Sequence, residues 1–124
     1  MYKNITDNSS FDVLKIYNFN KIGNLYCYYE FIRKNINKFD AFITLGCVIK
    51  GQTPHFDLIC NAVFNAILKL SIDFNKPIAN GIITALNMNQ AMERSKNRSN
   101  KKPNKGSEAA NALISILKNE PKKI

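Results

Sequence analysis

The stretch "DAFITLGCVIKGQTPHFDLICNAVFNAILKLSIDFNKPIANGIITAL", residues 40–86, places a helical pattern between two apolar runs. Residues 40–49 and 78–86 are nearly continuous in apolar and β-branched side chains, which is typical of strands buried on both faces of a parallel sheet. Apolar residues recur at helical spacing between them, so the stretch predicts two parallel strands joined by a crossover helix. The expected inward face of that helix comprises Phe56, Ile59, Val63, Ile67 and Leu70.

Signals at both ends bound this central helix. Thr53 is expected to cap its start, and Pro54 suits its first helical position. Asn75 and Pro77 are expected to end it.

Two further elements are predicted ahead of the central stretch. Residues 11–19 contain a short β-prone run, which predicts a strand. Residues 24–36 carry apolar side chains at helical spacing, which predicts a helix ending near Asn37.

Two more helices are predicted after the central stretch, separated by a basic loop at residues 96–106. Residues 87–95 form a short pattern that Asn87 can cap, and residues 107–118 form an amphipathic one. The inward residues expected in the last helix are Ala109, Ala110, Leu113, Ile114 and Leu117. The alternation of strands and helices predicts the α/β class with a mostly parallel sheet.

Length and composition predict a single globular domain. The chain has 124 residues, of which 45% are hydrophobic, and this is enough for one core. We expect a disordered or loosely held start at residues 1–10 and one domain over residues 11–124. Neither a long membrane-spanning run nor the apolar core of a secretory signal is evident, so we expect a cytoplasmic protein without a membrane partner.

The positive charge is concentrated near the end of the chain. The formal net charge is +9, and residues 94–124 contribute +7 of it, from nine Lys or Arg against two Glu. Such a tail can bind nucleic acid or phosphate ligands. No aromatic residues alternate with the basic ones, which makes nucleic acid the less favoured partner.

Cysteine and histidine usage argues against a metal site. Cys27, Cys47 and Cys60 lack CxxC spacing, and the chain has one histidine. We therefore expect buried, reduced thiols and no metal.

The turn between the first apolar run and the central helix has the composition of an anion site. Ligands of open α/β sheets bind at the carboxyl ends of the strands. Gly51 allows close backbone approach, and the amides of Gln52 and Thr53 lie where a helix N-terminus favours an anion. His55 follows in the first turn, where an imidazole can exchange a proton near pH 7.

Each of these features also has an ordinary structural interpretation. A histidine in a first turn is often a surface residue, a Thr-Pro start is often only a cap, and a basic loop is usually a solvated face. Arg94 and Lys105 both follow the second apolar run and can reach the same rim. Together, these groups favour a phosphate-bearing substrate and acid–base chemistry.

Three segments resemble, in order and spacing, the motifs of the 6,7-dimethyl-8-ribityllumazine synthase family. They are "DAFITLGCVIKGQTPHFDLICNAV" (40–63), "GIITALNMNQAMERS" (81–95) and "NKGSEAANAL" (104–113), within a resemblance that covers about residues 39–118. The resemblance implies a three-layer, flavodoxin-like α/β sandwich. It also implies the condensation of 5-amino-6-ribitylaminouracil with 3,4-dihydroxy-2-butanone 4-phosphate, which releases phosphate and water and requires no cofactor.

The resemblance also assigns roles to residues. The catalytic residues would be His55 for proton transfer, Arg94 on the phosphate and Lys105 near it. The substrate-binding residues would be Val48, Ile49, Gly51, Gln52, Thr53 and Asn80. In the family the sites lie between subunits of a pentamer, and some members form sixty-subunit shells. Arg94 and Lys105 would then come from the subunit next to the one that supplies His55.

The chain departs from the family pattern in its first part. We expect the family's first strand-helix unit to be missing, and "YNFNKIG" (17–23) stands where the family has P-G-[AS]-x-E, with Lys21 near the glutamate position. Asn80 replaces a common aromatic. Three interpretations remain open: an active synthase, a degenerate and inactive member, or a basic α/β protein that binds nucleic acid or phosphate.

Overall fold

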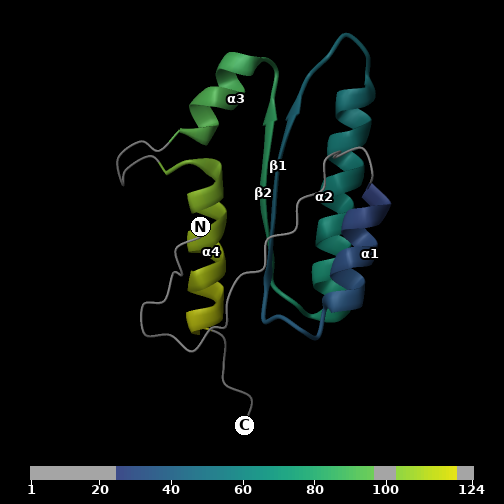
Figure 1. Ribbon diagram of the computed structural model, residues 1–124, viewed down its shortest axis with the longest axis vertical. Coiled ribbons are helices and arrows are strands. Elements are labelled where there is room, and N and C mark those ends of the chain that lie inside the picture. Colours follow the sequence, from purple (N-terminus) through teal and green to yellow (C-terminus); the bar gives the residue numbers. More distant parts are fainter. Residues whose placement is uncertain (1–24, 97–102, 120–124) are drawn as a thin grey trace.

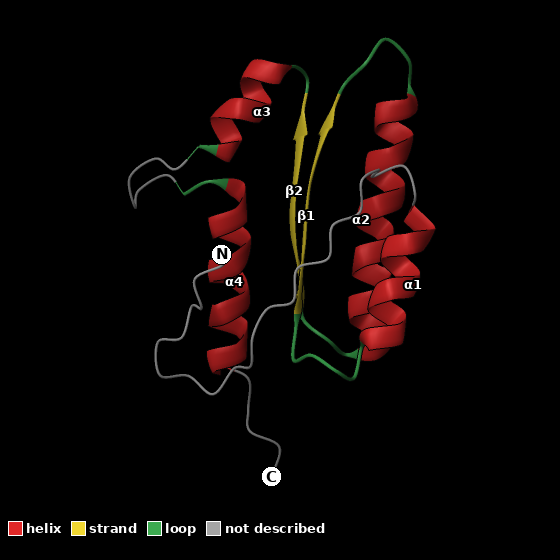
Figure 2. Cartoon of the chain, in the orientation of Figure 1, coloured by secondary structure: helices red, strands yellow, loops and turns green. Residues whose placement is uncertain are grey.

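The computed structural model describes residues 25–96 and 103–119, in which helices cover both faces of a pair of parallel strands (Figures 1 and 2). The predicted α/β class with a parallel sheet is confirmed. The strand predicted at residues 11–19 and the loose start predicted at residues 1–10 lie outside the described residues. The elements are α1 (Leu25–Asn35), β1 (Phe42–Ile49), α2 (His55–Phe74), β2 (Ile78–Ala85), α3 (Met88–Ser95) and α4 (Lys105–Asn119).

The two strands pair level with each other along their whole length. Phe42 is the partner of Ile78 at one end, and Ile49 is the partner of Ala85 at the other. The Lys50 amide donates to the Ala85 carbonyl at 2.9 Å, which continues the pairing past β1. The carboxyl ends of both strands therefore reach the same edge of the sheet, at the top of Figure 1.

The predicted crossover helix is confirmed as α2, and it packs on the sheet through Val63, Ile67 and Leu70, which are buried. Val63 and Ile67 contact Ile82 of β2 in one apolar cluster. Leu70, with 1% of its surface exposed, is the most buried large side chain in the described part of the chain. These contacts hold the start of α2 over the carboxyl edge of the sheet.

The ends of α2 differ in how well the sequence predicted them. Asn75 ends the helix in a left-handed conformation with φ of 47°, as predicted. The prediction that Thr53 caps the start is wrong, because the cap position falls on Pro54, which has no side-chain acceptor. The Pro54 carbonyl accepts from the Leu58 amide at 3.3 Å, so the helix begins one residue later than expected.

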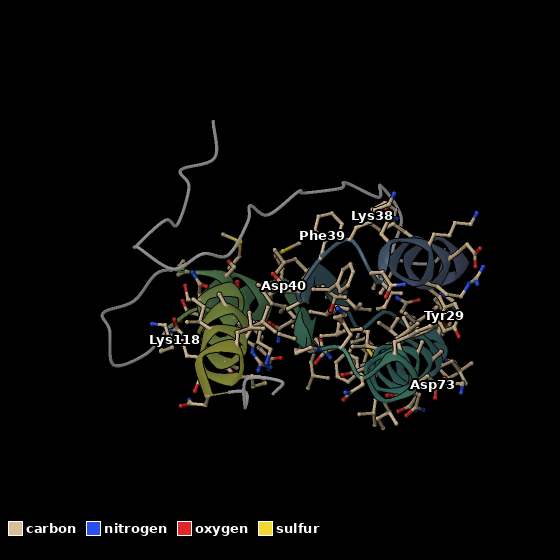
Figure 3. The ribbon with its side chains drawn as sticks, turned by 90° about the horizontal axis from the view of Figure 1, so that it is seen from below. Tyr29, Lys38, Phe39, Asp40, Asp73 and Lys118 are labelled. Atoms are coloured by element: carbon tan, nitrogen blue, oxygen red, sulfur yellow. The ribbon has the colours of Figure 1, made fainter. Side chains whose placement is uncertain are left out.

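The helix predicted at residues 24–36 is confirmed as α1, which lies beside α2 on one side of the strands (Figures 1 and 3). Ile32 of α1 and Ile36, the residue after that helix, are buried against Leu70 of α2. Phe42 and Ile78, at the starts of the two strands, pack against the same cluster. The core on this face thus runs from the amino ends of the strands up to the middle of α2.

The opposite face is covered by α3 and α4. The predicted cap of α3 is confirmed, since Asn87 Oδ1 accepts from the Gln90 amide at 2.9 Å. The last helix begins at Lys105 rather than at residue 107, because Asn104 Oδ1 accepts from the Ser107 amide at 2.7 Å and so caps an earlier turn.

The inward face of α4 is narrower than predicted. Ala109 and Leu113 are buried, and Ala110 and Leu117 are partly buried. Ile114 is 36% exposed, so its predicted inward position is wrong. It follows Leu113 directly, and one residue turns the helix by about 100° away from the sheet.

One face of β1 is open, which corrects the prediction of burial on both faces. Leu45 is 54% exposed and Cys47 is exposed. The cause is the position of α4, which lies over β2: a Cβ atom at Gly81 would lie 3.3 Å from that of Ala109. The predicted burial of Cys47 is therefore wrong, while Cys60 is partly buried; the side chain of Cys27 lies outside the described ones.

The length and composition of α2 also meet the requirements for a membrane-crossing helix. The helix has 20 residues, and an 18-residue window in it has a mean hydropathy of 1.2, so it is long and apolar enough to cross a membrane by length and composition only. A helix that covers a sheet can meet the same measure, because its inward face is apolar. The packing of α2 on the two strands it joins accounts for that face.

Candidate functional site

The candidate site lies at the carboxyl edge of the sheet, where β1 and β2 end side by side. Val48 is the register partner of Thr84, and Ile49 is the partner of Ala85. Val48 packs toward α2, as part of the cluster around Val63 and Ile67. The backbone of Val48 and Ile49 is thus fixed on two sides, by pairing and by packing, directly before the turn.

The turn leads into the start of α2, where no side chain caps the first backbone amides. Gly51, Gln52, Thr53 and Pro54 are exposed, and α2 has no side-chain cap. The first amides of an uncapped helix are unsatisfied donors at the positive end of the helix dipole. This start can therefore bind an anion, although the exposed carboxylate of Asp57 lies in the same turn and opposes it.

His55 is the first residue of α2 and its side chain is exposed. The imidazole ring makes no hydrogen bond or ion pair with any residue that the structure describes. The ring can therefore turn toward a ligand held at the helix start. Since imidazole can both take and give a proton near neutral pH, this is a suitable place for acid–base chemistry.

Arg94 reaches the same edge from the other layer. Its Nη1 donates to the Thr84 carbonyl at 3.4 Å, although the side chain comes from the last turn of α3. The exposed guanidinium keeps further donors for a ligand. The structure thus brings Arg94 to the level of Val48 and Ile49, as predicted for a group on this rim.

A local hydrogen-bond pair fixes the direction of α3. Asn87 Oδ1 accepts from the Gln90 amide, and Gln90 Oε1 accepts from the Leu86 amide at 2.8 Å. The helix therefore turns back directly after β2, and its last turn faces the strand end. The role of Gln90 was not predicted, although a Gln three residues after an Asn cap is the signature of such a pair.

Lys105 lies in a different place from His55. It is the first residue of α4, and its Nζ pairs with Glu108 Oε1 at 3.2 Å. Its neighbour Gly106 lies beside Leu45, in the middle of β1, on the face opposite α2. Within one chain, Lys105 and His55 therefore belong to different layers.

Asn80 is also distant from the carboxyl edge. It lies four residues before Thr84 on β2, or about 13 Å along the strand. Its Oδ1 accepts from the Ile82 amide at 3.0 Å, so the side chain lies along the outer edge of β2. The predicted site residues thus fall into one group at the end of β1 and the start of α2, and another made up of Arg94, Lys105 and Asn80, which lie on α3, α4 and β2.

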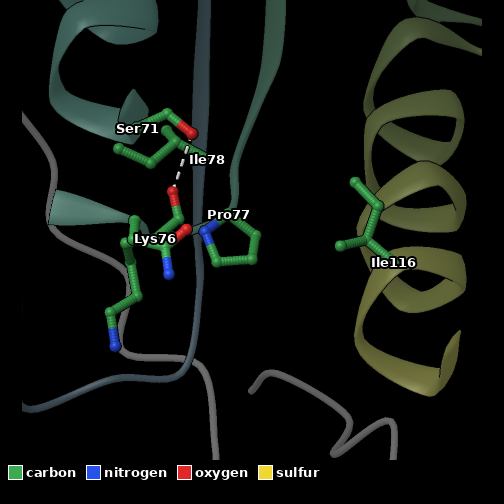
Figure 4. A pocket seen from close by; sticks show the side chains of 6 residues that line it. Ser71, Lys76, Pro77, Ile78 and Ile116 are labelled. Carbon is green, nitrogen blue, oxygen red and sulfur yellow. Dashed lines mark hydrogen bonds between the residues drawn. The ribbon is translucent and has the colours of Figure 1, made fainter. Parts of the chain in front are cut away.

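Other polar features lie apart from this edge. Burial is the main cause that raises the pKa of the Cys60 thiol, with the Asp57 carboxylate adding to it, so this thiol is a poor nucleophile. A pocket of about 300 Å³ lies at the amino end of β2 (Figure 4). Within the described ranges, no group of three or more His, Cys, Asp or Glu could hold a metal.

The pocket at the amino end has few chemical groups. Ser71 Oγ donates to the Lys76 carbonyl at 2.7 Å, which occupies the hydroxyl. The other lining residues are Asn75, Pro77, Ile78 and Ile116. It lies at the opposite end of β2 from the candidate site and adds nothing to it.

Comparison with known proteins identifies a protein family that matches this chain. The family model for 6,7-dimethyl-8-ribityllumazine synthase matches residues 26–120. A protein of that name from Cytophaga hutchinsonii is 47% identical over 78 residues, which are 63% of this chain and 47% of the relative. One from Mycolicibacterium gilvum is 45% identical over 76 residues, or 61% and 47%. One from Corynebacterium kroppenstedtii is 40% identical over 83 residues, or 67% and 52%. The chain thus spans about half the length of the curated relatives it matches.

Proposed function

Since the chain belongs to the 6,7-dimethyl-8-ribityllumazine synthase family, we propose that it catalyses the reaction for which the family is named. The substrates are 5-amino-6-ribitylaminouracil and 3,4-dihydroxy-2-butanone 4-phosphate, and the reaction releases phosphate and water. The proposed activity is a transferase step of riboflavin biosynthesis. It takes place in the cytoplasm, in a single domain formed by residues 11–124.

One observation carries the proposal: the uncapped start of α2 at the carboxyl edge of the sheet. An uncapped helix start binds a phosphate through backbone amides, at the positive end of the helix dipole. Gly51, Gln52 and Thr53 form the turn around this phosphate. Arg94 of the neighbouring subunit, held at the end of that subunit's β2, is the cation that neutralises it.

His55 transfers protons in this proposal. Forming the carbon–nitrogen bonds and expelling phosphate both require protons to move at groups beside the phosphate. The exposed ring at the first position of α2 is close to where the helix start would hold that phosphate. The backbone of Val48 and Ile49, fixed by pairing with β2, would bind the edge of the pyrimidine.

The division of the site between two layers supports a site between subunits. His55 belongs to the layer of α2, whereas Lys105 begins α4 on the other face of the sheet. We therefore assign His55 to one subunit, and Arg94, Lys105 and Asn80 to the next one. This assignment requires a homo-oligomer, and we propose the pentamer or the shell of sixty subunits that the family resemblance implies.

The first experiment measures the condensation itself. Purified full-length chain is mixed with both substrates, and lumazine formation is followed by absorbance and fluorescence, with assembly measured by light scattering. We expect product from an assembled sample. A folded, assembled chain that forms no product would contradict the proposal and indicate an inactive family member.

His55→Ala is expected to lower kcat by about 10²-fold or more, the usual contribution of a general acid or base, without loss of folding. The exposed side chain makes no contact that the fold needs. Asn89→Ala, an exposed substitution on α3, is the control and should retain the rate. Equal rates for His55→Ala and the control would remove the proton-transfer role.

Mixing two inactive variants tests the division between subunits. His55→Ala and Arg94→Ala, denatured together and reassembled in equal amounts, should recover about one quarter of the wild-type rate, because that fraction of interfaces combines two intact halves. Each variant reassembled alone should stay inactive. Absence of recovery in a mixture proven to co-assemble would place both residues in the same subunit's site.

A further inference from the structure

The two outer edges of the sheet differ, and the hydrogen bonds between the strands show how. In a parallel pair, alternate residues direct both backbone groups toward the same neighbour. The Phe42 amide bonds to the Pro77 carbonyl at 3.0 Å, and the Lys50 amide bonds to the Ala85 carbonyl. The even-numbered residues of β1 therefore face β2, and the odd-numbered residues of β2 face β1.

On the outer edge of β2, side chains occupy two of the outward backbone groups. The Ile82 amide, which points outward, donates to Asn80 Oδ1 at 3.0 Å. The Thr84 carbonyl, which also points outward, accepts from Nη1 of Arg94 on α3 at 3.4 Å. Side chains that occupy backbone groups in this way compete with a strand that would add there.

The outer edge of β1 has no such protection within the described residues. Its outward groups belong to Ile43, Leu45, Cys47 and Ile49, and no residue that the structure describes pairs with them. The side chains beside this edge are also open, since Leu45 is 54% exposed and Cys47 is exposed. Unpaired backbone groups next to exposed apolar side chains can pair with another strand.

The position of α1 decides the side from which a preceding strand would join. α2 connects β1 to β2 across one face of the sheet, and α1 contacts α2 on the same face (Figure 3). Crossovers between parallel strands share one hand. A strand ahead of α1 can meet that condition only on the side of β1 that faces away from β2.

From these observations we infer that the outer edge of β1 binds residues 11–19 of the same chain as a third, parallel strand. Their sequence, "FDVLKIYNF", is rich in β-branched and aromatic residues, and Asp12 and Lys15 suit a strand at the edge of a sheet. Residues 20–24 remain as the link to α1, within the usual length of such loops. The added strand pairs the four outward residues of β1 and removes an edge that would otherwise promote aggregation.

Disulfide scanning tests this pairing in the full-length chain. In a background with Cys27→Ser and Cys60→Ala, Cys47 is kept and a cysteine is placed at each of residues 13–18 in turn. Direct neighbours on parallel strands lie within disulfide range, whereas positions one residue away point to the other face. After mild oxidation, we expect an intrachain disulfide at one position of the scan, identified by mass spectrometry, and little at its two neighbours.

In a matched control, the target thiol lies on β2 instead of β1. Ile83 is the register partner of Cys47 on β2, so Cys47→Ser combined with Ile83→Cys presents a thiol one strand further away. This variant should form no disulfide with residues 13–18. Equal cross-linking from both targets would reflect random collisions and overturn the pairing.

Hydrogen exchange on the unmodified chain gives an independent reading. The amides of Leu45 and Cys47 should be protected, and Ile16→Pro, which removes a donor and disrupts the added strand, should speed their exchange at least about tenfold. Fast exchange of both amides in the unmodified chain would overturn the inference. So would Cys47–Cys47 dimers as the main oxidation product, because they would place a second copy on this edge.

Discussion

Gly81 lies where β1 and α4 both approach β2 closely. A Cβ atom there would lie 2.6 Å from Leu45 Cδ2 and 3.0 Å from the Thr44 carbonyl oxygen. Gly81→Ala should therefore lower the free energy of unfolding by about 1–3 kcal/mol, the usual cost of overpacking. Urea denaturation followed by circular dichroism measures the change.

Gly51→Ala is the control for this substitution. Gly51 has ordinary negative φ, and a Cβ atom there would have no neighbour within 4 Å. Its stability should stay within about 0.5 kcal/mol of the parent, as for other surface changes. A Gly81→Ala variant as stable as Gly51→Ala would show that Leu45 moves aside at no cost.

For single residues, the sequence predicted which residues stand at the site better than it predicted which residues contact one another. The position of His55 at the helix start followed from the turn before it, because glycine, proline and a β-branched run are local signals. The bond from Arg94 to the Thr84 carbonyl did not follow, since the two residues meet only when α3 turns back on the strand. The layer of Lys105 likewise depends on where α4 packs, which no local pattern fixes.

Among the elements, α3 is short and depends on its cap. Asn87→Ala removes the acceptor for the Gln90 amide and should destabilise the helix start by about 1 kcal/mol. Because α3 carries Arg94, we also expect a several-fold higher KM for the butanone phosphate with a smaller change in kcat. Steady-state kinetics over both substrates separate the two effects.

Asn89→Ala is the matched control on the same helix. Asn89 is exposed and forms no side-chain hydrogen bond within the described part of the chain. Its KM should equal that of the parent. If Asn87→Ala leaves KM unchanged while it lowers stability, α3 does not position Arg94.

The order of the described elements was predictable because strands and helices differ in apolar period over many residues. Which faces of each strand and helix are buried by other elements was not predictable. β1 reads as buried on both faces, yet Leu45 and Cys47 are exposed, because α4 lies over β2 instead. Coverage depends on tertiary packing, and an apolar run shows only that a strand can be covered.

For the whole molecule, the outward face of α2 is the feature that a single chain leaves unsatisfied. Leu58, Leu68 and Ile72 are 66%, 58% and 69% exposed, on the side of α2 away from the sheet. An exposed apolar face of this kind on a monomer usually marks a protein–protein contact. We expect it to become buried in the proposed homo-oligomer, and its apolar character also explains why α2 resembles a membrane helix in composition.

Ile72→Lys tests this face, because a lysine there would have to be buried without a partner on assembly. Folding of the chain should change little, since the side chain is exposed, but association should weaken by about tenfold or more. Light scattering over a dilution series measures the effect. Ala112→Lys, which adds the same charge at an exposed position of α4, is the control.

If the catalytic groups come from two subunits, the rate of Ile72→Lys should fall with dilution in step with the assembled fraction. A constant rate per chain from a dissociated sample would instead mean that each chain holds a complete site.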